Sequence, residues 1–213
     1  YERDFIDIKY RKTLSPFLTL STDWSWAERS ELPNNTDYKL INRKSIEGYT
    51  SNSPFNEELA NTGFPVHNAF TGAIRVAARP WLKFRIRNGE RREIPGSTPT
   101  LTLQYRKGID DILSSEADYD LIEIGIKHLF NVGVRGNVHF WLRGGSFLND
   151  SKMYFMDYKH FLGNKTPFTT TDPVGSFRLL DYYQFSTSDK YFTASIHYQF
   201  RRFLATTIPY VRM

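Results

Sequence analysis

Long stretches of this chain alternate apolar and polar residues with a period of two. In the clearest stretch, every second residue from 192 to 200 is apolar or aromatic, and the residues between them are polar. The apolar members are Phe192, Ala194, Ile196, Tyr198 and Phe200. Successive side chains of a β-strand point to opposite faces, so the pattern predicts a strand with one apolar and one polar face. No helix would produce this split, and β structure is therefore the strongest constraint on the fold.

The same period marks six other segments, and we expect seven strands in all. Their predicted ranges are 4–12, 16–27, 69–87, 98–107, 118–130, 136–146 and 190–201. The 16% aromatic content suits half-buried pleated surfaces, which favours an all-β chain. No apolar run is long enough for a membrane-spanning helix.

The connections between the predicted strands alternate in length. Short connections follow the first, third and fifth strands, whereas long segments, 28–68 and 147–189, follow the second and sixth. Bacterial outer-membrane barrels have short periplasmic turns and long extracellular loops. The order therefore predicts an antiparallel transmembrane β-barrel in the bacterial outer membrane, with both long segments extracellular and residues 1–213 forming one barrel portion.

The number of predicted strands bears on whether the barrel is complete. Bacterial single-chain barrels have an even number of strands, and seven leaves at least one unaccounted for. We therefore expect the chain to be the C-terminal part of a larger barrel. The alternative is an extra strand within 28–68, near 38–46.

Aromatic residues lie near the ends of the predicted strands and share the apolar parity of those strands, as in the two aromatic girdles of membrane barrels. At the outer ends they are Trp24, Trp26, Phe70 and Phe192, and toward the inner ends Phe130 and Phe200 are joined by Ile86. This placement predicts that the apolar residues from 192 to 200 face outer-membrane lipid. A sandwich whose aromatic residues face a common core explains the parity but not the placement at strand ends.

A basic stripe occupies the polar parity of the third predicted strand. It comprises Arg75, Arg79, Lys83, Arg85 and Arg87. In a barrel these cations face the lumen or lie at its rim, where they either pair with acids such as Asp7, Asp23 and Glu123 or attract an anionic solute or lipid headgroup. In a soluble protein they could neutralise nucleic-acid phosphates. Pairing with the acids is the preferred interpretation, and we expect no nucleic-acid partner.

The sequence offers little support for catalysis or cofactor binding. The chain has no cysteine, and its five histidines are scattered without metal-ligand spacing, so we expect no metal and no cofactor. Ser186, Ser188, Asp189 and His160 could supply parts of a hydrolytic triad, but no G-x-S-x-G motif is present and a triad is defined by geometry. We therefore expect a protein that is not an enzyme.

Several C-terminal motifs resemble a known family. They are Lys159-His-Phe-Leu-Gly-Asn-Lys165, Phe177-Arg-Leu-Leu-Asp-Tyr-Tyr183, Ser186-Thr-Ser-Asp-Lys-Tyr191 and His197-Tyr-Gln-Phe200. They are similar to the C-terminal barrel of Bacteroidetes outer-membrane proteins described as carboxypeptidase-like regulatory domain-containing proteins of unknown function. A weaker resemblance points to the Omp85 group of assembly and translocation barrels. The resemblance implies a longer barrel preceded by an immunoglobulin-like, non-catalytic regulatory domain.

Together, these observations favour a non-enzymatic outer-membrane barrel in transport, or in assembly and translocation at the cell surface. Its expected partners are outer-membrane lipid and other outer-membrane or periplasmic proteins in a complex. Besides the basic stripe, we expect function in the structured loop around His160, Gly163 and Asn164. The alternative is a soluble β-sandwich or lipocalin-like module that binds a carbohydrate or an apolar ligand. Its predicted pocket is lined by Trp24, Trp26, Trp81 and Trp141.

Overall fold

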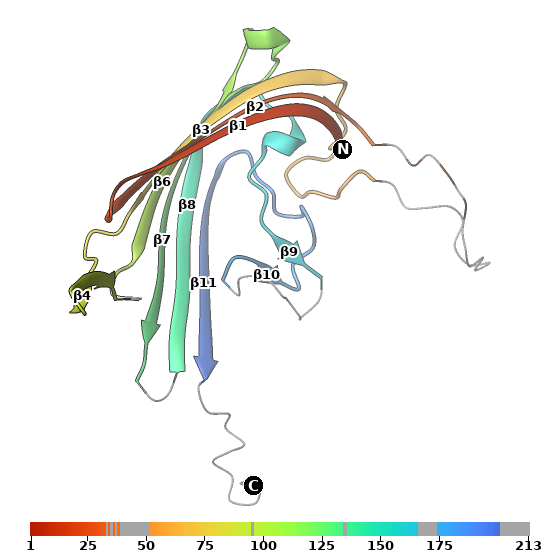
Figure 1. Cartoon of the computed structure of the whole chain (residues 1–213). Helices are drawn as coiled ribbons and strands as arrows, with labels where there is room; N and C mark the ends of the chain where they lie inside the picture. The colour runs from red at the N-terminus through yellow and green to blue at the C-terminus, as the bar shows by residue number, and fades with distance from the viewer. Residues whose placement is uncertain are drawn as a thin grey trace, which may run out of the picture.

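The computed structural model describes residues 1–32, 34, 36, 38, 52–94, 96–133, 136–165 and 174–200. Its centre is a strongly curved antiparallel sheet of seven strands that pair in the order β1-β2-β3-β6-β7-β8-β11 (Figure 1). The strands are β1 (Glu2–Ser15), β2 (Leu18–Ser30), β3 (His67–Ala78), β6 (Thr100–Ile109), β7 (Asp118–Asn131), β8 (Gly136–Lys152) and β11 (Lys190–Phe200). The prediction of an all-β antiparallel chain is confirmed.

The sheet is open in the part of the chain that the structure describes. β1 and β11 form its two edges, and the described residues form no closed barrel. The extra strand considered near 38–46 falls, apart from Tyr38, outside the described residues. Within the described ranges, no helix is both long and apolar enough to cross a membrane.

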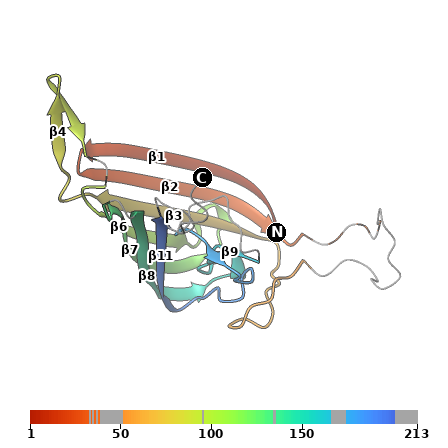
Figure 2. The same ribbon diagram turned by 90° about the horizontal axis from the view of Figure 1, so that it is seen from below.

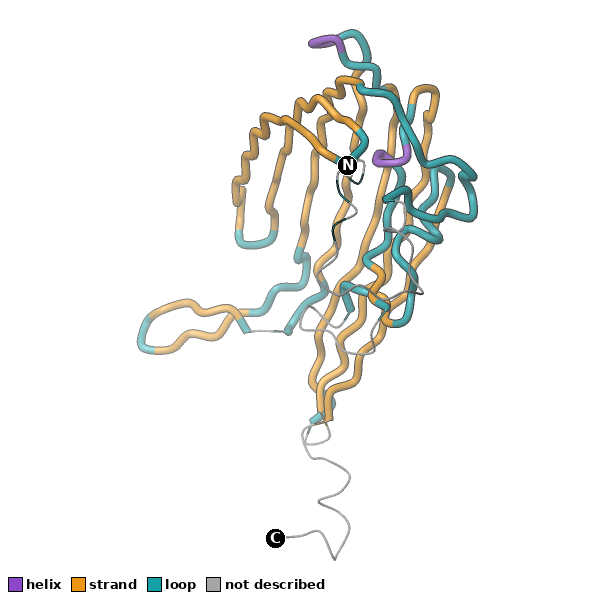
Figure 3. The backbone as a smooth tube through the Cα atoms, turned by 90° about the vertical axis from the view of Figure 1, so that its right-hand side faces the viewer, coloured by secondary structure: helices purple, strands orange, loops and turns teal. Residues whose placement is uncertain are grey.

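The third predicted strand was wrong in its extent. The range 69–87 holds two elements: β3 ends at Ala78, and β4 (Phe84–Arg87) pairs with β5 (Glu90–Glu93) in a separate hairpin that projects away from the main sheet (Figure 3). Pro80 lies between them and has no backbone N–H for a sheet hydrogen bond. The hairpin turns at Asn88 and Gly89, whose φ angles of 52° and 79° fit a two-residue type I′ turn.

The register of the main sheet brings the apolar residues of neighbouring strands together on one side, here called the apolar face. One row of directly paired residues crosses six strands: Leu20, Val76, Leu103, Ile124, Gly144 and Phe192. Much of this face is exposed, including 63% of Ile124, 72% of Phe192 and 75% of Ile196. Shifting the pairing of a strand by one residue would move its apolar side chains to the other face of the sheet. The observed register is therefore the one that the alternation favours.

The opposite side of the sheet, here called the polar face, lies inside the curve and is partly covered by the described residues of the segment 153–189, which are 153–165 and 174–189 (Figures 1 and 2). This segment leaves the sheet at the same end as the connection 31–66, and we call this end the long-loop end. It contains η2 (Phe155–Asp157) and the short parallel pair β9 (Gly163–Asn164) and β10 (Phe177–Arg178).

The buried core is small and lies at the long-loop end. Ala69, Ala117 and Tyr119 form a buried cluster, against which Phe147 and Met153 pack. Leu121 and Val174 are also fully buried. The main buried hydrophobic cluster therefore lies near the long-loop end, whereas large side chains of the apolar face stay exposed.

Candidate functional site

The structure disperses the predicted basic stripe. Arg75 lies on β3 and donates a hydrogen bond to Gln104 (Nε to Oε1, 2.7 Å). Arg79 follows β3 and forms an ion pair with Glu93 (2.8 Å), while its Nη2 also donates to the carbonyl of Pro16. The remaining members do not continue the row, because Lys83 precedes the projecting hairpin and Arg85 and Arg87 lie on β4.

Two of the acids proposed as partners of the stripe have other partners. Asp7 accepts a hydrogen bond from Ser25 and lies 3.9 Å from Arg3 and 3.8 Å from Lys9. Glu123, on the polar face of β7, pairs with Lys159 and accepts a hydrogen bond from Tyr191. Lys159 belongs to the segment 153–189, so this contact fixes the segment to the sheet.

A second ion pair, which is buried, joins the same segment to β2. Asp157 in η2 is fully buried and pairs with Arg29 at the end of β2 (Nη1 to Oδ1, 2.8 Å). Arg106 of β6 donates a hydrogen bond to the carbonyl of Asp157 (3.1 Å). A buried carboxylate is stable only with such compensation, so both contacts hold η2 against the polar face.

His160 lies in the segment 153–189 among aromatic rings. Its Nδ1 is 2.8 Å from Ser186 Oγ, and its ring centroid lies 5.1 Å from those of Phe155 and Tyr183. Burial and the nearby Arg106 guanidinium lower the pKa of His160 from about 6.5 to about 4, so the ring is neutral at neutral pH.

The two other predicted loop residues lie in a short strand, and the serines considered for a hydrolytic triad have separate partners. Gly163 and Asn164 form β9, where a Cβ on Gly163 would lie 2.7 Å from the carbonyl oxygen of Leu180, so the glycine permits a close backbone approach. Of the triad candidates, Ser188 donates a hydrogen bond to Glu58 (2.5 Å). Ser186 does contact His160, and it is only 2% exposed.

The lowered pKa of His160 predicts a specific pH dependence of stability. Between pH 6.5 and 4 the unfolded chain binds a proton at His160 that the folded chain excludes, so stability is fully present above pH 6.5 and falls as the pH drops toward 4. The loss should reach about 3 kcal/mol. Unfolding measured from pH 7 to 4 should therefore depend less on pH in His160→Gln than in the unmodified chain. Equal pH dependence of the two would contradict this assignment.

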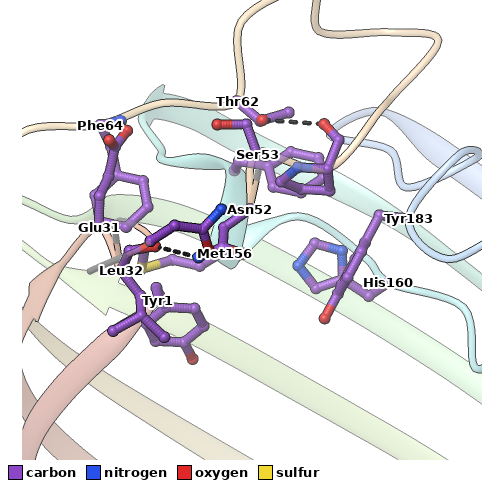
Figure 4. Close-up of a pocket in the computed structure, with 13 residues that line it drawn as sticks. Tyr1, Glu31, Leu32, Asn52, Ser53, Thr62, Phe64, Met156, His160 and Tyr183 are labelled. Carbon is purple, nitrogen blue, oxygen red and sulfur yellow. Dashed lines mark hydrogen bonds between the residues drawn. The ribbon is translucent and has the colours of Figure 1, made fainter. Parts of the chain in front are cut away.

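His160 also lines a cavity of about 590 Å³ at the long-loop end (Figure 4). The cavity lies between the start of β1, the end of β2, the segment 52–64, η2 and the turn at 183. The residues that form most of its wall are Tyr1, Glu31, Leu32, Asn52, Phe64, Met156, His160 and Tyr183. Apart from His160, sequence reasoning missed these residues, because no motif or periodicity links segments so far apart in the chain.

Asn56 clamps the two loops beside this cavity to each other. Its Nδ2 donates to the carbonyls of Tyr183 (2.8 Å), Gln184 (3.2 Å) and Ser186 (2.9 Å). Its Oδ1 accepts hydrogen bonds from the backbone N–H groups of Glu58 and Leu59. Because Asn56 is only 4% exposed, water cannot readily replace these partners.

We expect Asn56→Ala to reduce the free energy of unfolding by about 2 kcal/mol or more, since buried backbone groups would lose their partner. The matched control is Asn61→Ala, which removes an exposed side chain that accepts one hydrogen bond, from Gly63. The control should change stability by less than about 0.5 kcal/mol. Denaturant unfolding of both variants tests the clamp, and similar stabilities would argue against it.

The four tryptophans do not line one pocket. Trp24 and Trp26 lie on the apolar face, where with Phe70 they line a hollow of about 510 Å³. Trp141 pairs with Lys127 across the polar face, and Trp81 follows β3 and is 62% exposed. The described residues contain no cluster of His, Cys, Asp and Glu that could hold a metal ion.

Comparison with known proteins adds one finding. The model of the C-terminal domain of a family of unknown function, DUF5686, matches residues 1–213. The chain belongs to this family. The match confirms that the chain is the C-terminal domain of a family of unknown function. The resemblance to carboxypeptidase-like regulatory domain-containing proteins and the Omp85 kinship stay predictions. No curated protein and no solved structure matches the chain.

Proposed function

We propose that this DUF5686 C-terminal domain forms part of the wall of a bacterial outer-membrane β-barrel that works without chemistry of its own in transport, or in assembly and translocation at the cell surface. The observation that carries the proposal is the continuous apolar face. Soluble monomers rarely expose contiguous apolar patches of more than a few hundred Å². A face built from seven strands, with exposed Ile8, Ile124 and Ile196, suits lipid better than water.

The distribution of polar groups supports the same orientation. Ion pairs such as Lys159 with Glu123 and Arg29 with Asp157 lie on the side of the sheet that is covered by the segment 153–189. In a membrane barrel the polar side faces the lumen, and loops that fold inward narrow or plug it. The segment 153–189 would then close part of the lumen at the extracellular end.

The open edges of the sheet support the presence of further strands in the proposed barrel. A row of unpaired N–H and C=O groups at a sheet edge cannot face hydrocarbon, so β1 and β11 would each require a partner strand. We propose that further strands of a longer polypeptide, or of a partner protein, complete the barrel.

Membrane fractionation and gel mobility test the proposal. The native protein should pellet with outer membranes and require detergent for extraction. Its band should also shift between unboiled and boiled samples, because a closed barrel resists SDS until it is heated. A protein that stays in solution without detergent, with one mobility before and after boiling, would overturn the proposal.

A further inference from the structure

Aromatic rings line the cavity at the long-loop end on two opposite sides, here called its walls, and the two rings of each wall lie edge to face. Tyr1 and Phe64 form one wall, with ring centroids 6.4 Å apart, and His160 and Tyr183 form the other (Figure 4). Tyr1 is 60% exposed and Tyr183 is 45% exposed, so ring surface on both sides is open to a ligand. Aromatic rings attract flat apolar surfaces and C–H groups, and such walls suit a ring-shaped ligand with an apolar face.

Between the walls the lining mixes the apolar side chains of Leu32, Pro54 and Met156 with polar groups that are almost uncharged. Asn52 contributes an exposed amide, whose Nδ2 donates to the carbonyl of Leu32 (2.7 Å), and Ser53 and Thr62 contribute hydroxyl groups. Glu31 is the one carboxylate among the lining residues, and its Oε1 accepts a hydrogen bond from the N–H of Phe64 (2.7 Å). His160 is neutral because its pKa is about 4. Among the described lining residues, no basic side chain is charged at neutral pH, so this part of the lining has no cationic side chain for an anionic ligand.

The cavity is held in shape before any ligand arrives. Asn56 joins the segment that carries Asn52 to the turn at Tyr183, and Glu57 accepts a further hydrogen bond from Gln184 (2.7 Å). Preorganised walls lose little conformational entropy on binding. In addition, none of the described lining residues lies within a strand, whereas an extended peptide typically binds along an unpaired strand edge.

We propose that this cavity binds an uncharged carbohydrate. The sugar ring lies between the Tyr1–Phe64 wall and the Tyr183 ring, which contact its apolar faces. Its hydroxyl groups, at the ring edge, exchange hydrogen bonds with Asn52, Ser53 and Glu31. The cavity is formed by loops, η2 and the residues that flank β1 and β2, so this binding does not depend on the apolar face lying in a membrane.

Isothermal titration calorimetry of the full chain tests the proposal, in lauryldimethylamine oxide, a detergent without a sugar head group. The ligands are maltohexaose, cellohexaose and xylohexaose, with a neutral hexapeptide of Gly and Ser as the non-carbohydrate comparison. We expect saturable binding of at least one oligosaccharide and none of the peptide. Failure of all three oligosaccharides to bind, or binding of the peptide alone, would overturn the proposal.

Two variants locate the binding in the cavity. Tyr183→Ala should weaken the binding about tenfold, whereas Tyr182→Ala, which removes the neighbouring exposed ring outside the cavity, should leave it unchanged. Asn52→Leu removes the amide at an exposed position of the cavity, and it should also weaken binding. Equal affinities for Tyr182→Ala and Tyr183→Ala, with Asn52→Leu unaffected, would show that the sugar binds elsewhere and would contradict the proposed site.

Discussion

The substitution Ile196→Arg should destabilise the protein in lipid vesicles by about 2–4 kcal/mol, because the proposed function puts this position of the apolar face of β11 near the middle of the bilayer. Ile196 is 75% exposed, so the same change in a water-soluble sheet would alter stability by less than about 0.5 kcal/mol. The substitution therefore separates lipid from water as the surroundings of this face.

The matched control for this prediction is His197→Arg, one residue along β11 on the polar face. It should have a much smaller effect, because a lumenal position accepts a cation. Reversible unfolding of both variants in vesicles gives the two free energies. Full stability of Ile196→Arg would mean that the apolar face is in contact with water.

The second large effect is expected at Asp157. Asp157→Ala leaves the guanidinium of Arg29, only 12% of whose side chain is exposed, without its carboxylate partner. It also removes the acceptor of the Tyr154 N–H. Breaking one side of a buried ion pair costs about 3–5 kcal/mol, and the loss should release η2 from the polar face. Thermal unfolding and trypsin cleavage within 153–165 would report stability and detachment.

Two comparisons sharpen the Asp157 prediction. Asp181→Ala removes an exposed partner of Lys165 in the same segment and should change stability by no more than about 1 kcal/mol. Replacing both buried partners, as in Arg29→Met with Asp157→Leu, should regain much of the lost stability, since no uncompensated charge stays buried. Equal stabilities of Asp157→Ala and Asp181→Ala would show that the buried pair does not anchor the segment.

The main sheet was predictable because its signal is local. Each strand carries its own alternation, and the antiparallel register then aligns residues such as Leu103 with Ile124 without any further information. The prediction failed at 69–87. There the alternation of apolar and polar residues continues through Pro80, but the hydrogen bonds between strands cannot, because proline has no backbone N–H. A proline within an apolar alternation should have ended the predicted strand at that point.

The cavity could not be predicted from local sequence patterns, because the segments that line it and the contacts that hold them together join residues distant in sequence. Asn56 and Ser186 are 130 residues apart, and no spacing rule connects them. The contact between His160 and Ser186 spans 26 residues within an irregular segment. Only the expectation of a structured, functional loop around His160, Gly163 and Asn164 pointed to this region.

The most direct test of the central claim is a cysteine scan of β11. The chain has no native cysteine, so each residue from 190 to 200 can carry a single nitroxide label in vesicles. Electron paramagnetic resonance then compares access of oxygen, which concentrates in lipid, with access of a water-soluble nickel chelate. We expect oxygen maxima at Phe192, Ala194, Ile196, Tyr198 and Phe200, with a period of two. Maxima for the nickel chelate at those same positions would place the apolar face in water and contradict the account.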